Sequence, residues 1–428
     1  MNAGARDLNV VNAAQVARVR DRGAPRRGRE QGLLDLVPDG AIAIRGGRIA
    51  AVGPTRELLD DWGDEAVPTI DASGKTVLPG LIESHCHPLF KAAPHPPDAD
   101  LLAPGEIAGR TDGIWDTVRY TRDASEAELL AHLESVYARV LAGGVTTLEC
   151  KTGYTLTPDG EARDLRLLAQ SRASTSIELV STFLGAHMVP PEPGDEAAFV
   201  ETVVTEMLPH LDGLAEFADF CCDSDLFEHA NVARMLGEAR AQGLPTRVHA
   251  DGWGPAGGWR TAVEFGAASA DHLTFTSEAE IAEVGSTDTI ATLLPVAELI
   301  YMTERRANAR ALIEHEVAVA IATDFCSSIG SSSLVTTIGL AVPWFGLTPA
   351  EAIVGATLNA AYGLGLARDR GSLDIGKRGD VTILSATHPN DVYLAIGSPL
   401  VDTVVIGGEV ALRPGLQTSK EVHGCGSC

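Results

Sequence analysis

From Thr76 onward, short apolar runs rich in Val, Ile, Leu and Ala alternate with longer stretches of helical period. The apolar runs predict eight strands, which end at His87, Lys151, His187, Asp223, Asp251, His272, Pro295 and Asp324. The helical patterns between them cover residues 125–142, 160–171, 195–211, 231–242 and 304–314. Repeated strand–helix units of this kind predict a distorted (β/α)8 TIM barrel, whose active site lies at the carboxyl ends of the strands.

Both ends of the chain have a different pattern. Residues 40–53 predict two short strands around a glycine turn, and short glycine-punctuated strands return at 371–384 and 401–410. The opening segment shows no long helical period. We therefore expect the two ends to form one small β-sandwich domain beside the barrel. The predicted segments are 1–75 and 366–428 for this domain, with a flexible tail, and 76–365 for the barrel.

Composition and charge narrow the choice of partner. The 428 residues are 45% hydrophobic and 21% charged, which is typical of a globular protein. The formal net charge of −25 argues against nucleic acid or an anionic membrane as the main partner, because both require a basic surface. The seven cysteines are scattered, and no leader or membrane-spanning run is found, so we expect a cytoplasmic protein. The terminal pair Cys425 and Cys428 could bind metal, but a lone C-x-x-C at a chain end is more often inert.

Two histidines separated by one residue follow the first apolar run of the barrel segment. On a strand that begins at Leu81, His85 and His87 point to the same side and Cys86 to the other. Two imidazoles on one side of a strand end can share a metal ion. Such a pair alone is weak evidence, because buried histidines also have purely structural roles.

Further candidate ligands stand at later strand ends. His249, His272 and Asp324 end the fifth, sixth and eighth predicted strands. We predict that His85, His87, His249 and Asp324 hold one divalent ion, with zinc favoured and iron or manganese as alternatives. Such an ion lowers the pKa of a bound water from about 15.7 towards 7 and so provides hydroxide. His272 then suits a general base or proton shuttle, and Asp324 can combine ligation with accepting a proton.

Longer motifs surround these positions. They are LPGLIESHCH at 78–87, GGVTTLECKTGY at 143–154, TFLGAHMVPP at 182–191, VHAD at 248–251, SADHL at 269–273 and ATDF at 322–325. With these motifs the chain resembles the amidohydrolase superfamily and, within it, the imidazolonepropionases, which open an imidazolone ring in histidine degradation. The resemblance extends from Gly40 to about Val410, which is nearly the whole chain.

This resemblance implies the same barrel, β domain and metal ligands, and a tendency to form homodimers. It also implies that Tyr154 and His187 line the substrate site, where His187 helps to polarise the carbonyl under attack. A phenol and an imidazole can both donate hydrogen bonds to a developing oxyanion. The alternative for Tyr154 is a tyrosine that only packs within the barrel.

Three segments depart from the family. Gly252 follows His-Ala-Asp where imidazolonepropionases carry a glutamate that hydrogen-bonds the ring, and Trp253 comes next. The segment KAAPH at 91–95 lacks the arginine that binds the substrate's propionate, and a lysine or histidine does not reproduce a bidentate guanidinium. After Asp324 the sequence reads FCSSIG, which makes Cys326 a candidate substrate contact.

We therefore predict a metal-dependent hydrolase that keeps the hydrolytic chemistry of the family and acts on another substrate. The expected reaction is cleavage of a C–N bond in a small cyclic amide, an opening of an imidazolone-like ring. One alternative is a deaminase or iminohydrolase of a small nitrogen heterocycle, which would release ammonia. Another is a non-hydrolytic or non-catalytic relative, but such relatives typically lose metal ligands that this chain keeps.

Overall fold

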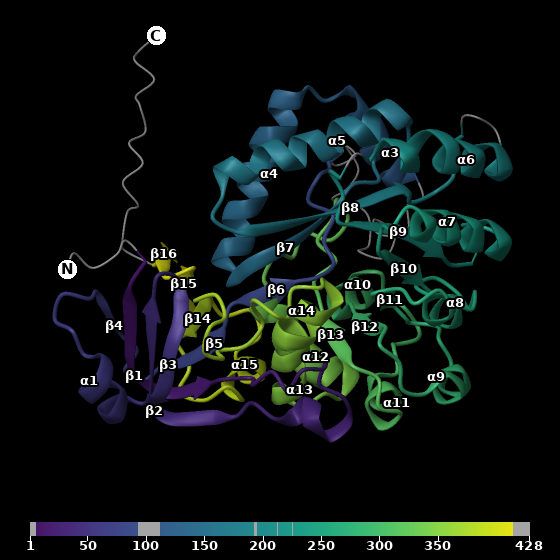
Figure 1. Ribbon diagram of the computed structural model, residues 1–428. Helices are drawn as coiled ribbons and strands as arrows, with labels where there is room; N and C mark the ends of the chain where they lie inside the picture. Colours follow the sequence, from purple (N-terminus) through teal and green to yellow (C-terminus); the bar gives the residue numbers. More distant parts are fainter. Residues whose placement is uncertain (1–5, 93–111, 192–194, 212, 225, 414–428) are drawn as a thin grey trace, which may run out of the picture.

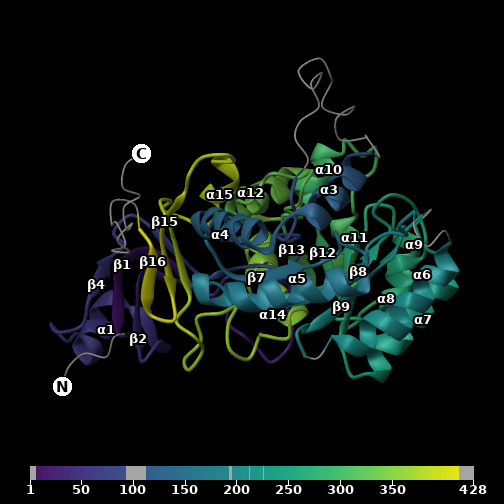
Figure 2. The ribbon, with the colours of Figure 1, turned by 90° about the horizontal axis from the view of Figure 1, so that it is seen from above.

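Two sheets organise the molecule, as Figure 1 shows for the computed structural model. One is a ring of parallel strands surrounded by helices, and the other joins the first and last parts of the chain. Figure 2 shows the second sheet lying beside the barrel. The described residues are 6–92, 112–191, 195–211, 213–224 and 226–413.

The barrel has eight parallel strands in chain order, from β6 to β13. They are β6 (Leu81–Glu83), β7 (Val145–Lys151), β8 (Glu178–Ala186), β9 (Phe217–Cys222), β10 (Thr246–Ala250), β11 (Ser269–His272), β12 (Ile290–Leu293) and β13 (Val319–Ile321). Nearly every strand residue is buried, because helices cover one side of each strand and the interior is filled on the other. The predicted TIM-type barrel is confirmed, and the predicted strand ends lie at most four residues beyond the last residue of each observed strand.

Helices follow most strands and pack around the ring. Their bounds are α3 (Asp112–Asp123), α4 (Glu126–Ala142), α5 (Pro158–Ser171), α6 (Glu196–Thr202), α7 (His229–Ala241), α8 (Gly258–Glu264), α9 (Glu278–Val284), α10 (Pro295–Ile300), α11 (Ala309–Glu314), α12 (Leu334–Phe345), α13 (Pro349–Val354) and α14 (Ala360–Gly363). Helix α4 begins with a capping box, in which Ser125 and Glu128 satisfy each other's backbone N–H groups.

Two of the predicted helices differ in detail from their patterns. The pattern at 304–314 becomes helical only at Ala309, because Asn308 caps α11 and the Ala307 N–H is used by the carboxylate of Glu298. The pattern at 195–211 begins as α6, and then a wider turn and a short 3-10 turn extend it to His210.

The second sheet pairs both ends of the chain. Its order is β16-β15-β14-β5-β1-β2-β3, with β4 pairing to β1. The strands are β1 (Leu8–Ala17), β2 (Leu36–Arg45), β3 (Arg48–Pro54), β4 (Thr69–Asp71), β5 (Thr76–Pro79), β14 (Val381–Leu384), β15 (Val401–Ile406) and β16 (Glu409–Leu412). The predicted β domain from both termini is thus confirmed, as one mixed sheet with its own apolar core.

Two details of this domain were not expected from the sequence. Strand β5 belongs to its sheet although it lies beyond residue 75, where we placed the domain boundary. A short helix, α1 (Thr55–Trp62), also follows β3 and buries Leu58 against the strands. Helix α15 (Asp391–Leu394) lies between β14 and β15 in the chain and packs against α12.

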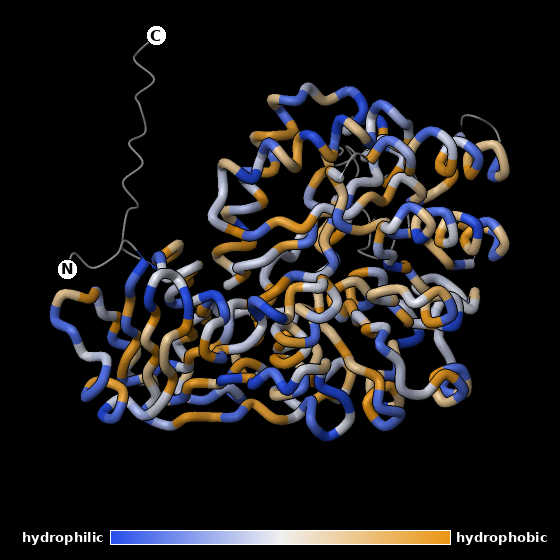
Figure 3. The backbone as a smooth tube through the Cα atoms, viewed as in Figure 1, coloured by the Kyte–Doolittle hydropathy of each residue, from blue (hydrophilic) through white to orange (hydrophobic). Residues whose placement is uncertain are grey.

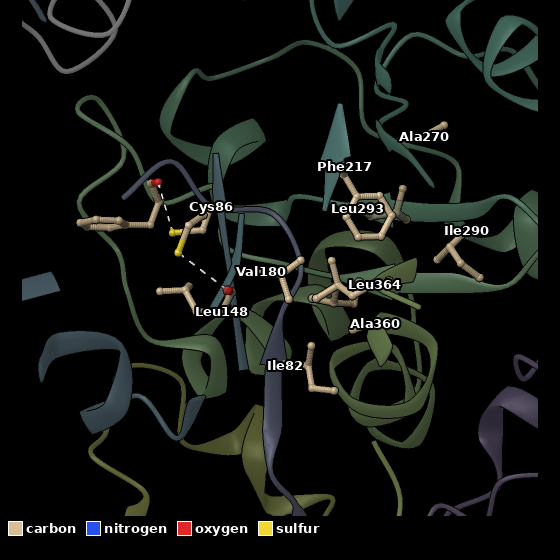
Figure 4. Close-up of a cluster of buried hydrophobic side chains, with 14 of the residues drawn as sticks. Ile82, Cys86, Leu148, Val180, Phe217, Ala270, Ile290, Leu293, Ala360 and Leu364 are labelled. Atoms are coloured by element: carbon tan, nitrogen blue, oxygen red, sulfur yellow. Dashed lines mark hydrogen bonds between the residues drawn. The ribbon is translucent and has the colours of Figure 1, made fainter. Parts of the chain in front are cut away.

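The barrel interior changes from apolar to polar along its axis. At the end near α14, Ile82, Val180, Phe217 and Leu364 gather into an apolar floor (Figure 4). Figure 3 shows hydrophobic positions following the strands of both sheets. None of the described helices is long and apolar enough to cross a membrane.

Candidate metal centre

The barrel closes at its carboxyl end, beyond the last residues of its first and last strands. The Asp324 N–H donates to the His85 carbonyl at 3.2 Å, and the His87 N–H donates to the Phe325 carbonyl at 2.8 Å. The carboxylate of Glu83 accepts hydrogen bonds from the backbone N–H groups of His85 and Thr323. The predicted ligands from the two strand ends are thereby held side by side.

Four side-chain atoms converge at this closure. The Nε2 atom of His87 lies 3.3 Å from Nε2 of His85, 3.4 Å from Nε2 of His249 and 3.4 Å from Oδ1 of Asp324. Nε2 of His85 lies 3.5 Å from the same Asp324 oxygen. A tetrahedral ion with ligand bonds of about 2.1 Å has ligand–ligand distances of about 3.4 Å, and these four distances agree with that value. The structure thus brings the four predicted ligands together.

Hydrogen bonds at Nδ1 of His85 and of His249 determine where the lone pairs of these two rings point. Nδ1 of His85 lies 2.7 Å from Oδ2 of Asp271, and Nδ1 of His249 lies 3.0 Å from Oδ1 of Asp219. A carboxylate accepts, so both Nδ1 atoms donate and both Nε2 atoms carry lone pairs. Nitrogen lone pairs that face each other at hydrogen-bond distance repel unless a cation or proton lies between them.

Burial and the local carboxylates set the charge of the ligands. Burial lowers the pKa of His87, and it lowers that of His249 well below the usual value. For His85, burial and Lys151 oppose the charged form, but Asp271 and Asp324 outweigh them and raise its pKa to about 9. Hydrogen bonds from His85 and His87 outweigh burial and hold the pKa of Asp324 well below its usual value. The site therefore attracts positive charge, either a proton or a cation.

Backbone strain accompanies the centre. Asp251, His272 and Asp324 have φ values of 51°, 81° and 57°, in the left-handed region that L-residues rarely adopt. All three follow or end barrel strands and turn their side chains at the mouth of the ring. Strained residues of this kind cluster at functional sites, where the surrounding structure must hold them in place.

His272 lies beside the ligands. Its ring centroid is 5.3 Å from those of both His85 and His249. Burial lowers the pKa of His272 to about 4, so the ring is neutral near pH 7 and can accept a proton. Its predicted role as a base or shuttle remains a prediction that this position supports.

His187 and Tyr154 flank the opposite side of His87. The His187 ring stacks on that of His87 at 5.3 Å, and Tyr154 meets the His187 ring edge-on at 5.7 Å. His187 Nδ1 donates to the Gly153 carbonyl at 3.2 Å, and burial lowers the pKa of His187 to about 3. Its Nε2 therefore carries a lone pair, and the predicted polarisation of a carbonyl requires that this nitrogen first gain a proton.

A cleft opens from His272 to the surface. It is lined by Gly252, Trp253, His272, Thr274, Ala297, Glu298, Tyr301 and Thr303. Trp253 is 54% exposed, and its ring meets that of Tyr301 edge-on at 4.7 Å. Among the described residues, no lysine or arginine lines this cleft.

Cys326 lies behind Tyr301. The Tyr301 hydroxyl is 2.6 Å from the Ser328 hydroxyl, and the Cys326 thiol is 3.3 Å from the same oxygen. Burial raises the pKa of Cys326 to about 12, so it is a neutral thiol rather than a nucleophile. Cys86 faces away from the ligands, and its sulfur contacts the Phe325 carbonyl at 3.8 Å (Figure 4).

Asp223 organises the turn that carries Trp253. Its carboxylate accepts hydrogen bonds from the N–H groups of Gly252, Trp253 and Gly254 at 2.6 to 3.1 Å. A Cβ atom at position 252 would lie 3.0 Å from Asp223 Oδ2 and 3.2 Å from His272 Cγ. The position at which the family carries a glutamate is thus filled by a tight turn.

Of the segment 91–95, the structure describes only Lys91 and Ala92, and Lys91 pairs with Glu128 at 2.6 Å. Cys425 and Cys428 also lie outside the described residues.

Sequence reasoning missed a layer of buried charged residues directly beneath the ligands. They are Glu149, Lys151, Asp219, Arg247 and Asp271, all fully buried. The sequence did contain a signal for this layer, because each charged residue interrupts an apolar run that becomes a barrel strand. Arg247 precedes His249 by two residues on the same strand, so it points to the same side and into the barrel.

Fold and site together define a TIM-barrel hydrolase with a metal centre at its strand ends. The model of the amidohydrolase family matches residues 76–411, and that of the imidazolonepropionase-like composite domain of bacteria matches 40–64. The chain is 39% identical over 394 residues to the imidazolonepropionase of Geobacillus kaustophilus (strain HTA426), covering 89% of this chain and 92% of that protein. It is 40% identical over 397 residues to that of Rubrobacter xylanophilus (strain DSM 9941 / JCM 11954 / NBRC 16129 / PRD-1), covering 91% and 95%. The chain therefore belongs to the amidohydrolase family, in its imidazolonepropionase-like branch, and is an enzyme that acts on C–N bonds other than peptide bonds.

Solved structures share the fold at low sequence identity. A zinc-bound adenosine deaminase from Xanthomonas campestris is 20% identical with a TM-score of 0.70, and the match covers 95% of this chain and 93% of that one. The zinc complex of atrazine chlorohydrolase TrzN from Arthrobacter aurescens TC1 is 19% identical with a TM-score of 0.73, and the match covers 95% of each chain. These similarities support the architecture described above.

Proposed function

We propose that this enzyme hydrolyses a C–N bond in a small cyclic amide with an imidazolone-like ring, and that its substrate is not imidazolone propionate. The convergence of three imidazole nitrogens and one carboxylate oxygen, with four contacts of 3.3 to 3.5 Å among them, supports the hydrolytic chemistry. A non-hydrolytic relative is disfavoured because such relatives typically lose metal ligands, and this chain keeps all four predicted ones.

The side chains around the centre divide the work of the reaction. His85, His87, His249 and Asp324 would hold the ion, with zinc favoured for three imidazoles and one carboxylate. When bound, such an ion lowers the pKa of coordinated water and supplies a nucleophile at neutral pH. Asp324 and the neutral His272 both lie beside the proposed ion site, and each could accept a proton there. The neutral His187 can accept a hydrogen bond at Nε2 from an N–H group of the substrate ring, or take up a proton there.

The cleft supports a substrate without a carboxylate tail. Its described lining offers aromatic edges from Trp253 and Tyr301 and the buried carboxylate of Glu298, whereas a carboxylate ligand requires a cationic partner. With glycine at position 252, the substrate ring lacks the hydrogen bond that a glutamate makes from this position in the family. A neutral heterocycle that rests against Trp253 fits this lining better than a propionate does.

The decisive experiment is a substrate screen on protein of measured metal content. Imidazolones, hydantoins, cyclic ureas and aminoheterocycles are compared with imidazolone propionate by kcat/KM, with ring opening and ammonia release followed separately. We expect a neutral cyclic amide to give the highest value. Imidazolone propionate as the best substrate would refute the proposed change of substrate, and ammonia release without ring opening would favour the deaminase or iminohydrolase alternative.

Two further proposals concern the state of the protein. We propose a homodimer, following the family tendency, and a cytoplasmic location, following the sparse, scattered cysteines. Light scattering at several protein concentrations tests the dimer, and a monomer throughout would contradict it. Fractionation of the native cells tests the location.

A further inference from the structure

Two buried carboxylates stand behind the metal ligands, one for each of two histidines. Asp219 on β9 accepts from Nδ1 of His249 with its Oδ1, and Asp271 on β11 accepts from Nδ1 of His85 with its Oδ2. These contacts orient the two rings so that their Nε2 atoms face the same point. The position of each carboxylate therefore sets the position of one donor atom.

One side chain reaches both carboxylates. Lys151, at the end of β7, extends across the barrel interior, and its Nζ donates to Asp219 Oδ2 at 2.5 Å. The same Nζ lies 3.8 Å from Asp271 Oδ2 and donates to Glu149 Oε1 at 3.0 Å. Asp219 thus uses one oxygen for the histidine and the other for the lysine.

The rest of the layer cannot replace this ammonium at Asp219. Arg247 donates to Asp271 Oδ2 at 3.1 Å and lies 3.0 Å from Glu149, and its other donors go to the carbonyls of Ser84 and Gly363. Among the described residues, the only cation within ion-pair distance of Asp219, other than His249 itself, is Lys151. Without Lys151, three buried carboxylates would face one guanidinium, and Asp219 would be free to turn away from His249.

We propose that Lys151 is a positioning residue, which fixes His85 and His249 for cation binding by holding the carboxylates behind them. This inference rests on the proposed metal centre. Residues that orient metal ligands in this way typically change metal affinity by about 10–100-fold when replaced. Lys151 would therefore act on the cation without touching it.

The test uses two variants of this layer. Lys151→Met removes the ammonium but leaves unpaired buried charge, which can prevent folding. The double variant Lys151→Met with Glu149→Gln removes one charge of each sign, so the balance of the layer is kept while both histidine-linked carboxylates lose the lysine. Glu149→Gln alone keeps Lys151 and serves as the internal control. Lys377→Met is the control for loss of a buried lysine elsewhere, since Lys377 pairs with Asp21.

The readouts are zinc affinity, by competition with a chelator of known affinity, and the ¹⁵N shifts of the histidine ring nitrogens. We expect the double variant to bind zinc about 10–100-fold more weakly and to show altered shifts for two histidines, while both controls keep wild-type affinity. Wild-type affinity and shifts in the folded double variant would overturn the inference. Equal weakening in Lys377→Met would also overturn it, because general destabilisation would then explain the effect. Absence of zinc binding by the wild-type protein would instead refute the proposed function.

Discussion

Replacing Gly252 with glutamate tests whether this turn excludes the side chain that the family carries. The new Cβ would lie 3.0 Å from Asp223 Oδ2 and 3.2 Å from His272 Cγ, so both neighbours must shift by a few tenths of an ångström. Overpacking of a tight site costs about 1–3 kcal/mol, and Gly252→Ala measures this steric cost alone.

The glutamate adds a charge beside a buried carboxylate. Two unit charges about 5 Å apart repel by about 3 kcal/mol at an effective dielectric constant of about 20, and water in the open cleft reduces this to about 1–3 kcal/mol. Burial raises the pKa of Asp223 to about 6, so this group is charged at pH 7.5 and largely protonated at pH 5. The extra destabilisation of Gly252→Glu over Gly252→Ala should therefore be present at pH 7.5 and shrink at pH 5.

Chemical unfolding of both variants at the two pH values provides the measurement. The comparison is made between the two variants because both contain the same metal ligands, and the pH dependence of metal binding then cancels. Equal free energies of unfolding for Gly252→Glu and Gly252→Ala at pH 7.5 would refute the reasoning. So would an extra cost that stays the same at pH 5.

Four other predictions concern the centre and its cleft. His249→Ala or Asp324→Ala should lose both bound metal, measured by elemental analysis, and activity; metal-free activity would contradict the mechanism. The carboxylates around His85 raise its pKa to about 9, so metal binding near pH 7.5 should release about one proton. Calorimetry in buffers of different ionisation enthalpy measures this release, and a binding enthalpy that does not depend on the buffer would contradict it. Cys326→Ser should retain activity, because burial raises the pKa of the thiol to about 12 and leaves it neutral; loss of turnover with intact folding would oppose this. Trp253→Ala should raise KM by about 10-fold with kcat retained, since an aromatic contact contributes about 0.5–1.5 kcal/mol, and an unchanged KM would place the substrate elsewhere.

The outline of the fold was predictable because barrel strands are buried on both sides and read as apolar runs. The ends of the strands were harder to predict. β6 ends at Glu83 and β13 at Ile321, but the buried pattern continues beyond both into irregular backbone that carries the predicted ligands. Hydropathy does not distinguish a paired strand from a buried segment that leaves the ladder. Helix α1 was missed because it is short and packs by a single buried face.

The sequence by itself predicted the four ligands, since an H-x-H pair, a histidine and an aspartate at strand ends have few other uses together. Only the tertiary structure decided how those ligands are held. Lys151, Asp219 and Asp271 come from three different strands, and they meet because the barrel closes into a ring. A contact between side chains so far apart in the chain depends on strand order and register. Those are properties of the closed sheet, and no local pattern of residues contains them.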